Sequence, residues 1–136
     1  MSNNLSERHY GGTFCLSKAG LAEGTNSATL KTAAPNGAGI DFCIDGILYH
    51  LADGDNIAMT ACAQQADDTS CLYLVTVNSG GTVTTTKGTE RATEDVLNGE
   101  YALEWPAAPS GGCPIGGFKI VLDGGTFTSG TTDITG

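Results

Sequence analysis

The sequence predicts an all-β domain of about eight to ten short strands, folded as a small β-sandwich or barrel of jelly-roll type. Gly makes up 20 of the 136 residues, about twice its usual share of roughly 7%. Thr is abundant and charged residues make up only 15% of the chain, which favours short strands joined by tight turns. A hairpin signature at Asp45-Gly46 is the third observation. Sandwich and barrel share the same alternation, so both stay open.

The segment 40–51 carries the strongest local signal. Asp45-Gly46 fits a two-residue type I′ turn, whose two central residues both need a positive φ. Counting outward from the turn gives three pairs of apolar residues on one side of the hairpin, and we expect that side to face the core. The pairs are Ile44 with Ile47, Phe42 with Tyr49, and Ile40 with Leu51.

The opposite side of this hairpin pairs Cys43 with Leu48 and Asp41 with His50. Asp41 and His50 could form half of a catalytic dyad, but a surface ion pair worth about 0.2–1 kcal/mol explains them better. The chain lacks a Gly-x-Ser-x-Gly elbow, a His-Glu-x-x-His motif and a P-loop. We therefore expect no enzyme, no catalytic residues and no cofactor.

Shorter patterns predict the remaining elements. We expect strands at 13–16, 28–32, 57–62, 72–77, 82–87, 101–105 and 118–122. A three-residue loop at 79–81 would pair Val77 with Val83. Residues 93–97 fit one helical turn with Thr93 as its cap. Asp53–Asn56 is predicted to be a turn, because the later acidic ligands of a calcium loop are missing.

The five cysteines do not form an evident framework. Their odd number and the absence of a Cys-x-x-Cys motif favour reduced thiols that pack as small hydrophobic side chains. A Cys62–Cys71 bridge formed after release from the cell stays open. His9 and His50 are not at metal-ligand spacing, so no metal site is expected. The cysteines are Cys15, Cys43, Cys62, Cys71 and Cys113.

The charge balance argues against two classes of partner. The net charge is −9 and the pI is about 4.3, whereas nucleic acids and anionic membranes need a basic face. No apolar run has the length of a signal peptide core or a membrane helix. We therefore expect synthesis in the cytoplasm of the producing cell.

The chain divides into a flexible N-terminal arm at 1–12 and a single β domain at 13–136. Arg8, His9 and Tyr10 place a cation and two rings in the arm, so this segment either anchors the chain on a partner or is a plain tail. Trp105, beside Pro106, is a candidate for an exposed aromatic ring of the kind that binds sugars. A lid over the core explains it equally well.

Several segments resemble a β-rich module of tailed-phage virion proteins, such as capsid decoration and head-fibre proteins. The resemblance covers about residues 40–136. Besides the Asp-Gly hairpin, it is carried by the segments Leu72-Tyr73-Leu74-Val75, Gly81-Thr82-Val83, Lys87-Gly88-Thr89-Glu90, Pro106-Ala107-Ala108-Pro109, Pro114-Ile115-Gly116-Gly117-Phe118-Lys119-Ile120 and Gly125-Thr126-Phe127-Thr128-Ser129-Gly130-Thr131-Thr132. The chain departs from the module in its five cysteines and in lacking a fibre shaft or tip.

The resemblance and the short chain together imply a capsid decoration, or cement, protein. Such a protein would be a homotrimer at the virion capsid surface, bound to the major capsid protein on the outside of the icosahedral shell, which it would stabilise. Arg8, His9 and Tyr10 would then be capsid contacts. A head-fibre base, a tail or baseplate adaptor, and a carbohydrate-binding module at the virion surface are the alternatives.

Overall fold

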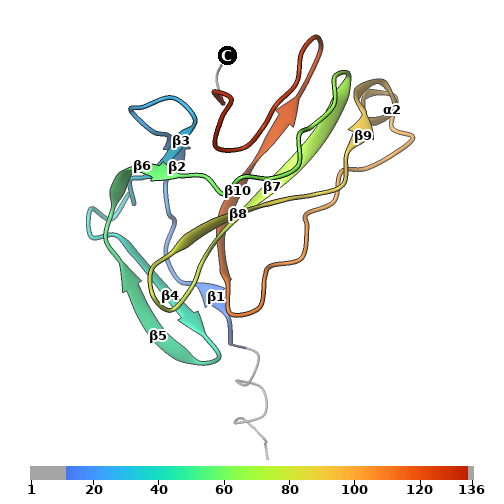
Figure 1. Cartoon of the computed structure of the whole chain (residues 1–136). Coiled ribbons are helices and arrows are strands. Elements are labelled where there is room, and N and C mark those ends of the chain that lie inside the picture. The colour runs from blue at the N-terminus through green and yellow to red at the C-terminus, as the bar shows by residue number, and fades with distance from the viewer. Residues whose placement is uncertain (1–11, 135–136) are drawn as a thin grey trace, which may run out of the picture.

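The structure is a computed structural model that describes residues 12–134. Apart from one short helix, its regular secondary structure consists of three antiparallel sheets. The arrangement is consistent with the predicted small all-β sandwich (Figure 1). The elements in this part of the chain are β1 Phe14–Cys15, β2 Leu21–Glu23, β3 Thr29–Thr32, β4 Ile40–Ile44, β5 Ile47–Leu51, β6 Gly54–Ala58, β7 Thr69–Val77, β8 Val83–Lys87, β9 Arg91–Ala92, α2 Thr93–Leu97 and β10 Cys113–Val121.

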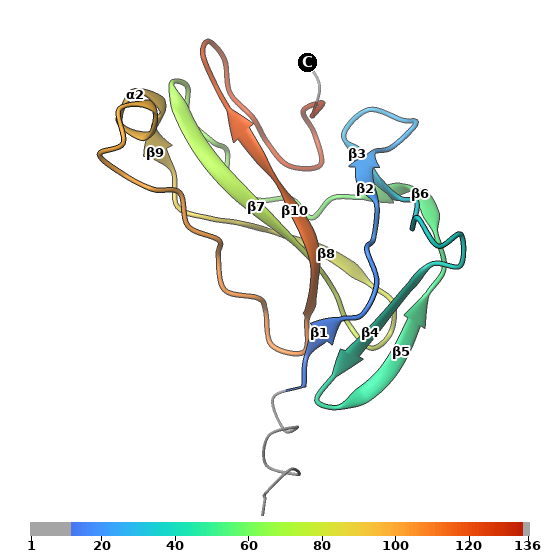
Figure 2. The same ribbon diagram turned by 180° about the vertical axis from the view of Figure 1, so that it is seen from behind.

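The sheets differ in their place in the molecule. The first has the strand order β1-β4-β5, the second β10-β7-β8 with β9 also pairing with β7, and the third β2-β3-β6. Figures 1 and 2 both show β1, β4 and β5 at one end of the molecule and α2 at the other. The core cluster joins side chains from all three sheets.

The β4–β5 hairpin has the predicted turn and register. Asp45 and Gly46 have φ values of 50° and 80°, as a type I′ turn requires. All five predicted pairs are observed. On the predicted core side, Ile40, Phe42 and Ile44 are buried, and Tyr49 and Leu51 are half-buried and pack against the core.

Ile47 is the exception, and its expected place in the core is wrong. Its side chain is 58% exposed, whereas Ile44 opposite it is 7% exposed. The difference follows from the strand order, because β4 lies between two neighbours and β5 lies at the edge of its sheet. The first residue after the turn is therefore left open to solvent.

Strand β7 is the centre of the largest sheet. Tyr73, Val75 and Val77 on this strand are fully buried. The Tyr73 ring stacks on Phe118 with 5.2 Å between ring centroids, and it meets Phe127 edge-on at 5.3 Å. Strand β8 pairs with β7, and Val77 lies opposite Val83, which confirms the register expected for this hairpin.

The segment 53–58 differs from the sequence prediction because polar side chains decide its structure. The expected turn at Asp53–Asn56 overlaps β6, which spans Gly54–Ala58 and ends before the predicted strand does. Asp55 accepts a hydrogen bond from the Thr25 backbone N–H at 2.9 Å, and Asn56 accepts one from Asn26 at 2.7 Å. These bonds to a distant loop hold a turn-like sequence in a strand.

The helical turn is confirmed, but the cap assigned to it is wrong. Ala92 occupies the cap position, with no side-chain hydrogen bond. The Thr93 hydroxyl instead lies 3.0 Å from the Ser70 hydroxyl and donates to the Leu122 carbonyl at 3.3 Å. Thr93 therefore ties the helix to β7 and to the end of β10.

The strand expected at 101–105 is not present, and β2 was not predicted. Trp105 lies on the sheet where Gly117 leaves room for it, since a Cβ on Gly117 would come within 2.4 Å of the indole ring. The segment before β10 thus covers a sheet face without joining the sheet.

We predict that Phe42→Ala lowers the free energy of unfolding by about 3–5 kcal/mol, because it empties a core site that is 1% exposed. Ile47→Ala is the matched control and should change stability by less than about 0.5 kcal/mol. Urea denaturation of both variants gives the two values. Equal losses would mean that Phe42 and Ile47 do not differ in burial as described.

Candidate functional site

The residues expected to contact a partner, Arg8, His9 and Tyr10, lie outside the described residues, as does nearly all of the expected arm. The described chain begins at Gly12, whose carbonyl accepts a hydrogen bond from the Gly46 N–H at 2.9 Å. The Thr13 hydroxyl likewise accepts from the Asp45 N–H at 3.1 Å. The N-terminal segment therefore joins the domain at the tip of the β4–β5 hairpin.

An exposed apolar face lies next to this junction. Phe14 and Leu16 at β1 and Leu48 on β5 are 49%, 55% and 63% exposed. Phe14 pairs with Cys43, and Cys43 pairs with Leu48, so these three side chains form one row across the sheet. We call the outer surface of the β1-β4-β5 sheet, with Phe14, Leu16 and Leu48, the apolar face. The exposed Ile47 lies opposite Ile44 on the other side of the sheet.

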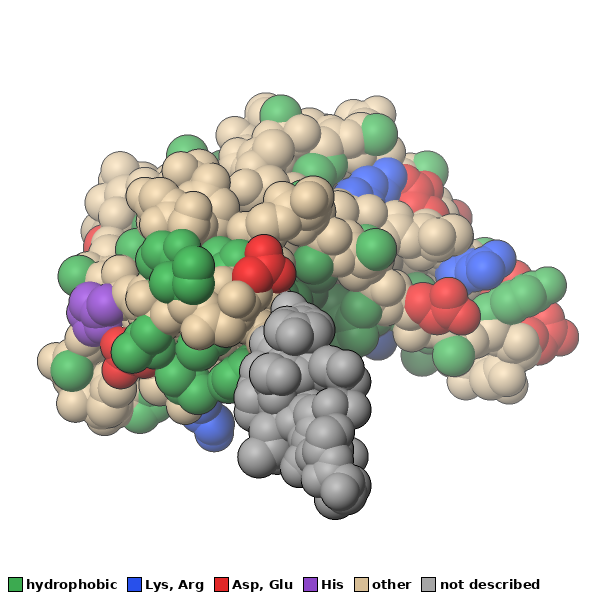
Figure 3. Space-filling view, turned by 90° about the horizontal axis from the view of Figure 1, so that it is seen from below, with side chains coloured by type: hydrophobic (Ala, Val, Ile, Leu, Met, Phe, Trp, Pro, Cys, Tyr) green, Lys and Arg blue, Asp and Glu red, His purple; other side chains and the backbone are tan. Residues whose placement is uncertain are grey.

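The apolar face has the size of the largest apolar patch on a typical monomer. A large side chain presents on the order of 200 Å² when fully exposed, so three side chains about half exposed give about 300 Å² of apolar surface. Patches of this size on a monomer are often contact sites. Figure 3 views this end of the molecule from below and shows hydrophobic side chains gathered there.

Sequence reasoning missed the apolar face, although part of its signal was present. The predicted hairpin register already placed Cys43 and Leu48 on the side away from the core. The pairing of Phe14 with Cys43 joins segments 29 positions apart, and no local pattern predicts that contact. Exposure was decided by which strand lies at the edge of the sheet.

Asp41 and His50 lie on the same outer surface, where they form the expected ion pair. His50 Nδ1 is 2.8 Å from Asp41 Oδ1, and both side chains are about half exposed. The Asp41 backbone N–H donates to the Ser17 hydroxyl at 3.0 Å. The Ser17 hydroxyl is thus engaged with the backbone, and the arrangement fits a surface pair better than a catalytic dyad.

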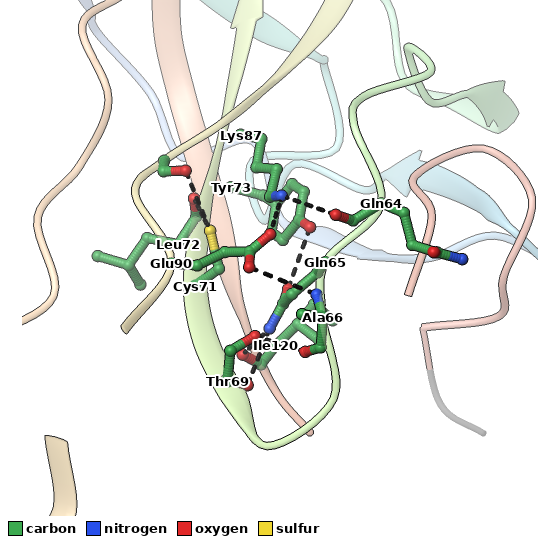
Figure 4. A network of polar contacts seen from close by, with 11 residues as sticks. Gln64, Gln65, Ala66, Thr69, Cys71, Leu72, Tyr73, Lys87, Glu90 and Ile120 are labelled. Carbon is green, nitrogen blue, oxygen red and sulfur yellow. Dashed lines mark hydrogen bonds and ion pairs between the residues drawn. The ribbon is translucent and has the colours of Figure 1, made fainter. Parts of the chain in front are cut away.

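A buried polar network fastens the loop before β7 to the sheet (Figure 4). The Gln65 side chain is fully buried. Its amide nitrogen donates to the Thr69 and Ile120 carbonyls at 2.9 and 3.3 Å. The Tyr73 hydroxyl donates to the Gln65 side-chain oxygen at 3.1 Å, and burial raises the pKa of Tyr73. The network satisfies buried groups and offers none to a substrate.

An ion pair continues this network toward the surface. The Lys87 ammonium contacts the Glu90 carboxylate and also donates to the Gln64 carbonyl at 3.1 Å. The second Glu90 oxygen accepts from the Ala66 N–H at 3.4 Å. Lys87 and Glu90 therefore hold the 64–66 loop against β8, and their charged groups serve the fold.

All five thiols are free. Cys71 and Cys113 are buried, as expected, while the other three are half-buried. Burial raises the pKa of Cys71 above its ordinary value, and it raises the pKa of Cys113 from 9.0 to about 11, with Cys15 and Cys43 adding to that rise. Cys71 and Cys113 thus keep their protons at neutral pH, where only a thiolate is a good nucleophile.

The remaining hollows lie near β10. One of about 580 Å³ is lined by residues 119–127 and 132–134. A smaller, apolar one lies beside Trp105, Leu74 and Gly117. Trp105 is 54% exposed, so it is both a cover for the sheet and an accessible ring, and the two expectations for this residue are each met in part.

Residues 12–134 contain neither a cluster of metal-binding side chains nor a membrane-spanning helix. Among residues 12–134, no three or more His, Cys, Asp or Glu side chains are grouped so that they could hold a metal ion. Over the same residues, no helix has the length and apolar character needed to cross a membrane. The apolar face and the accessible Trp105 ring are candidate binding surfaces.

Comparison with models of known protein families gave no match, and comparisons with curated proteins and with solved structures gave none either.

We predict that stability falls at alkaline pH in a way that depends on Cys113. The folded state holds the Cys113 proton up to about pH 11, and the unfolded chain releases it near 9.0. The contribution to stability is therefore complete below about pH 9 and declines as the pH rises from 9 to 11. Urea denaturation across this range should show a smaller decline for Cys113→Ala than for the unchanged chain. Parallel declines would contradict the assignment.

Proposed function

We propose that this protein is a phage capsid decoration protein, which binds the outside of an icosahedral shell and stabilises it. The observation that carries the proposal is the apolar face, which lies where the N-terminal segment joins the domain. An accessible apolar surface suits binding to another protein surface. The sequence resemblance to phage virion modules supplies the identity of that partner, the major capsid protein.

The proposed action is mechanical. Each copy would bridge neighbouring shell subunits, adding contact area that opposes outward pressure from packaged DNA. The apolar face would supply hydrophobic burial at about 25 cal/mol per Å² of apolar surface, and the arm with Arg8, His9 and Tyr10 would add polar contacts. In the homotrimer that the resemblance implies, three copies bind as one unit, so weak single contacts give high avidity.

We predict that the protein co-sediments with expanded shells of the phage that encodes it, prepared without this protein. Phe14→Ser should weaken the binding at least about tenfold, because it removes a central aromatic contact. Leu97→Ser is the matched control, since Leu97 is 78% exposed on α2 at the other end of the molecule, and it should bind unchanged. Removal of residues 1–12 should leave the fold intact and weaken binding.

No binding at saturating concentration would overturn the proposal, and equal binding by all variants would exclude the apolar face and the arm as the contact. Immunogold labelling of virions locates the protein independently. Label on the tail would assign it to a tail or baseplate adaptor, and label on projecting fibres would assign it to a head-fibre base.

A carbohydrate-binding module at the virion surface is the second candidate, and the position of Trp105 favours it. The ring rests on Gly117 and remains 54% exposed, so its orientation is fixed while part of its surface is accessible. Sugar rings pack on aromatic side chains held in this way. The apolar hollow beside Trp105 would receive the ring of the sugar.

Trp105 is the sole tryptophan of the chain, so fluorescence tests this candidate directly. If the candidate is right, adding host polysaccharide should shift the emission maximum to shorter wavelength. Tyr101→Phe should leave the response unchanged, and Trp105→Phe should abolish binding in a glycan array. An unchanged emission, together with an array without hits, would eliminate the carbohydrate module.

A further inference from the structure

Strand β5 leaves one edge of its sheet open. It is the last strand in the order β1-β4-β5, and Figures 1 and 2 both show it at the outside of the molecule. In a hairpin with a two-residue turn, the residues flanking the turn form a hydrogen-bonded pair, and the pairs alternate from there. The backbone groups of Ile47, Tyr49 and Leu51 thus point to β4, and those of Leu48 and His50 point outward.

The outward groups of β5 lack partners within the described chain. Among residues 12–134, no hydrogen bond joins the backbone N–H or carbonyl of Leu48 or His50 to another segment. The strand is regular over five residues, contains neither Pro nor a charged Lys, Asp or Glu, and has exposed apolar side chains at Ile47 and Leu48. An edge with these properties readily pairs with another strand.

Two other edge strands of the domain are protected. On β8, the Thr85 N–H donates to the Thr60 hydroxyl at 3.2 Å, and the Thr85 carbonyl accepts from the Cys62 thiol. Strand β6 carries the charge of Asp55, and Asn56 interrupts its regularity with a φ of 56°. Charges and irregular residues are common means of blocking edge-to-edge pairing, and β5 has neither.

We propose that β5 pairs antiparallel with β5 of a second copy of this chain, around a two-fold axis at Tyr49. This register places Leu48 of each copy opposite His50 of the other, so all the outward groups of these two residues are paired. The two three-stranded sheets become one sheet of six strands. A one-residue shift in register would place Leu48 and His50 opposite residues whose backbone groups point to β4, and would leave the outward groups unpaired.

The charge distribution favours a second copy at this edge. With a net charge of −9, two copies repel each other over most of their surfaces. Strand β5 carries no acidic residue, so pairing there brings no like charges directly opposite. The exposed Leu48 side chain and the unpaired backbone groups of this edge would be covered in the contact.

The inference does not depend on shell binding, but the dimer would take the place of the three-fold assembly that the sequence resemblance implies. A contact of β5 with itself is self-complementary and closes as a dimer. The dimer would join the two apolar faces into one continuous surface, leaving Phe14 and Leu16 of both copies accessible. Mass measurements without any shell test it separately from shell binding.

Sedimentation velocity of the full chain over a range of concentrations tests the proposal. We expect a dimer with twice the single-chain mass of 13.8 kDa. Leu48→Lys places a charge at the edge without disturbing the core and should raise the dissociation constant about 100-fold, tenfold for each copy. Leu97→Lys, a change of the same kind on α2, should leave the dimer intact.

A second pair of variants separates the contribution of the β5 backbone to the dimer from that of the His50 side chain. His50→Pro removes an outward N–H, which an edge strand tolerates, and should weaken the dimer more than His50→Ala does. Circular dichroism establishes that each variant is folded. A monomer at all concentrations, a trimer, or a dimer unaffected by both Leu48→Lys and His50→Pro would overturn the proposal.

Discussion

The two-residue turn at Asp45-Gly46 is the constraint on which the apolar face and the open edge of β5 depend. Both residues have positive φ, and the tight turn leaves one register for the hairpin. That register puts Ile40 and Phe42 into the core and turns Leu48 to the outside. A slip by one residue would exchange the two sides, losing the core contacts and the apolar face together. Packing and surface chemistry thus have a common origin.

Sequence reasoning succeeded where structure is local and failed where distant segments decide. The hairpin register followed from the turn and the alternation around it, and the pairing of Val77 with Val83 from a similar count. The strand at β6 depends on hydrogen bonds that Asp55 and Asn56 accept from a loop about 30 positions away. The exposure of Ile47 depends on sheet order, which alternation does not encode.

The polar side chains around Gln65 are engaged in holding the fold. Gln65 and Tyr73 bond each other, and Lys87 and Glu90 fasten a loop to β8. The β1-β4-β5 sheet, in contrast, presents accessible apolar side chains and an edge strand with unpaired backbone groups. These are features of contact between proteins, and they led us to propose a structural function before a catalytic one.

The central proposal is that the β1-β4-β5 sheet contacts the shell. Hydrogen–deuterium exchange of the full chain, with and without expanded shells, tests this claim most directly because it locates the contact in the sequence. The account predicts slowed exchange on shell binding in peptides covering residues 12–16 and 46–51, with α2 unchanged. Slowed exchange confined to residues 105–117 or 119–134, with none at the hairpin, would contradict it.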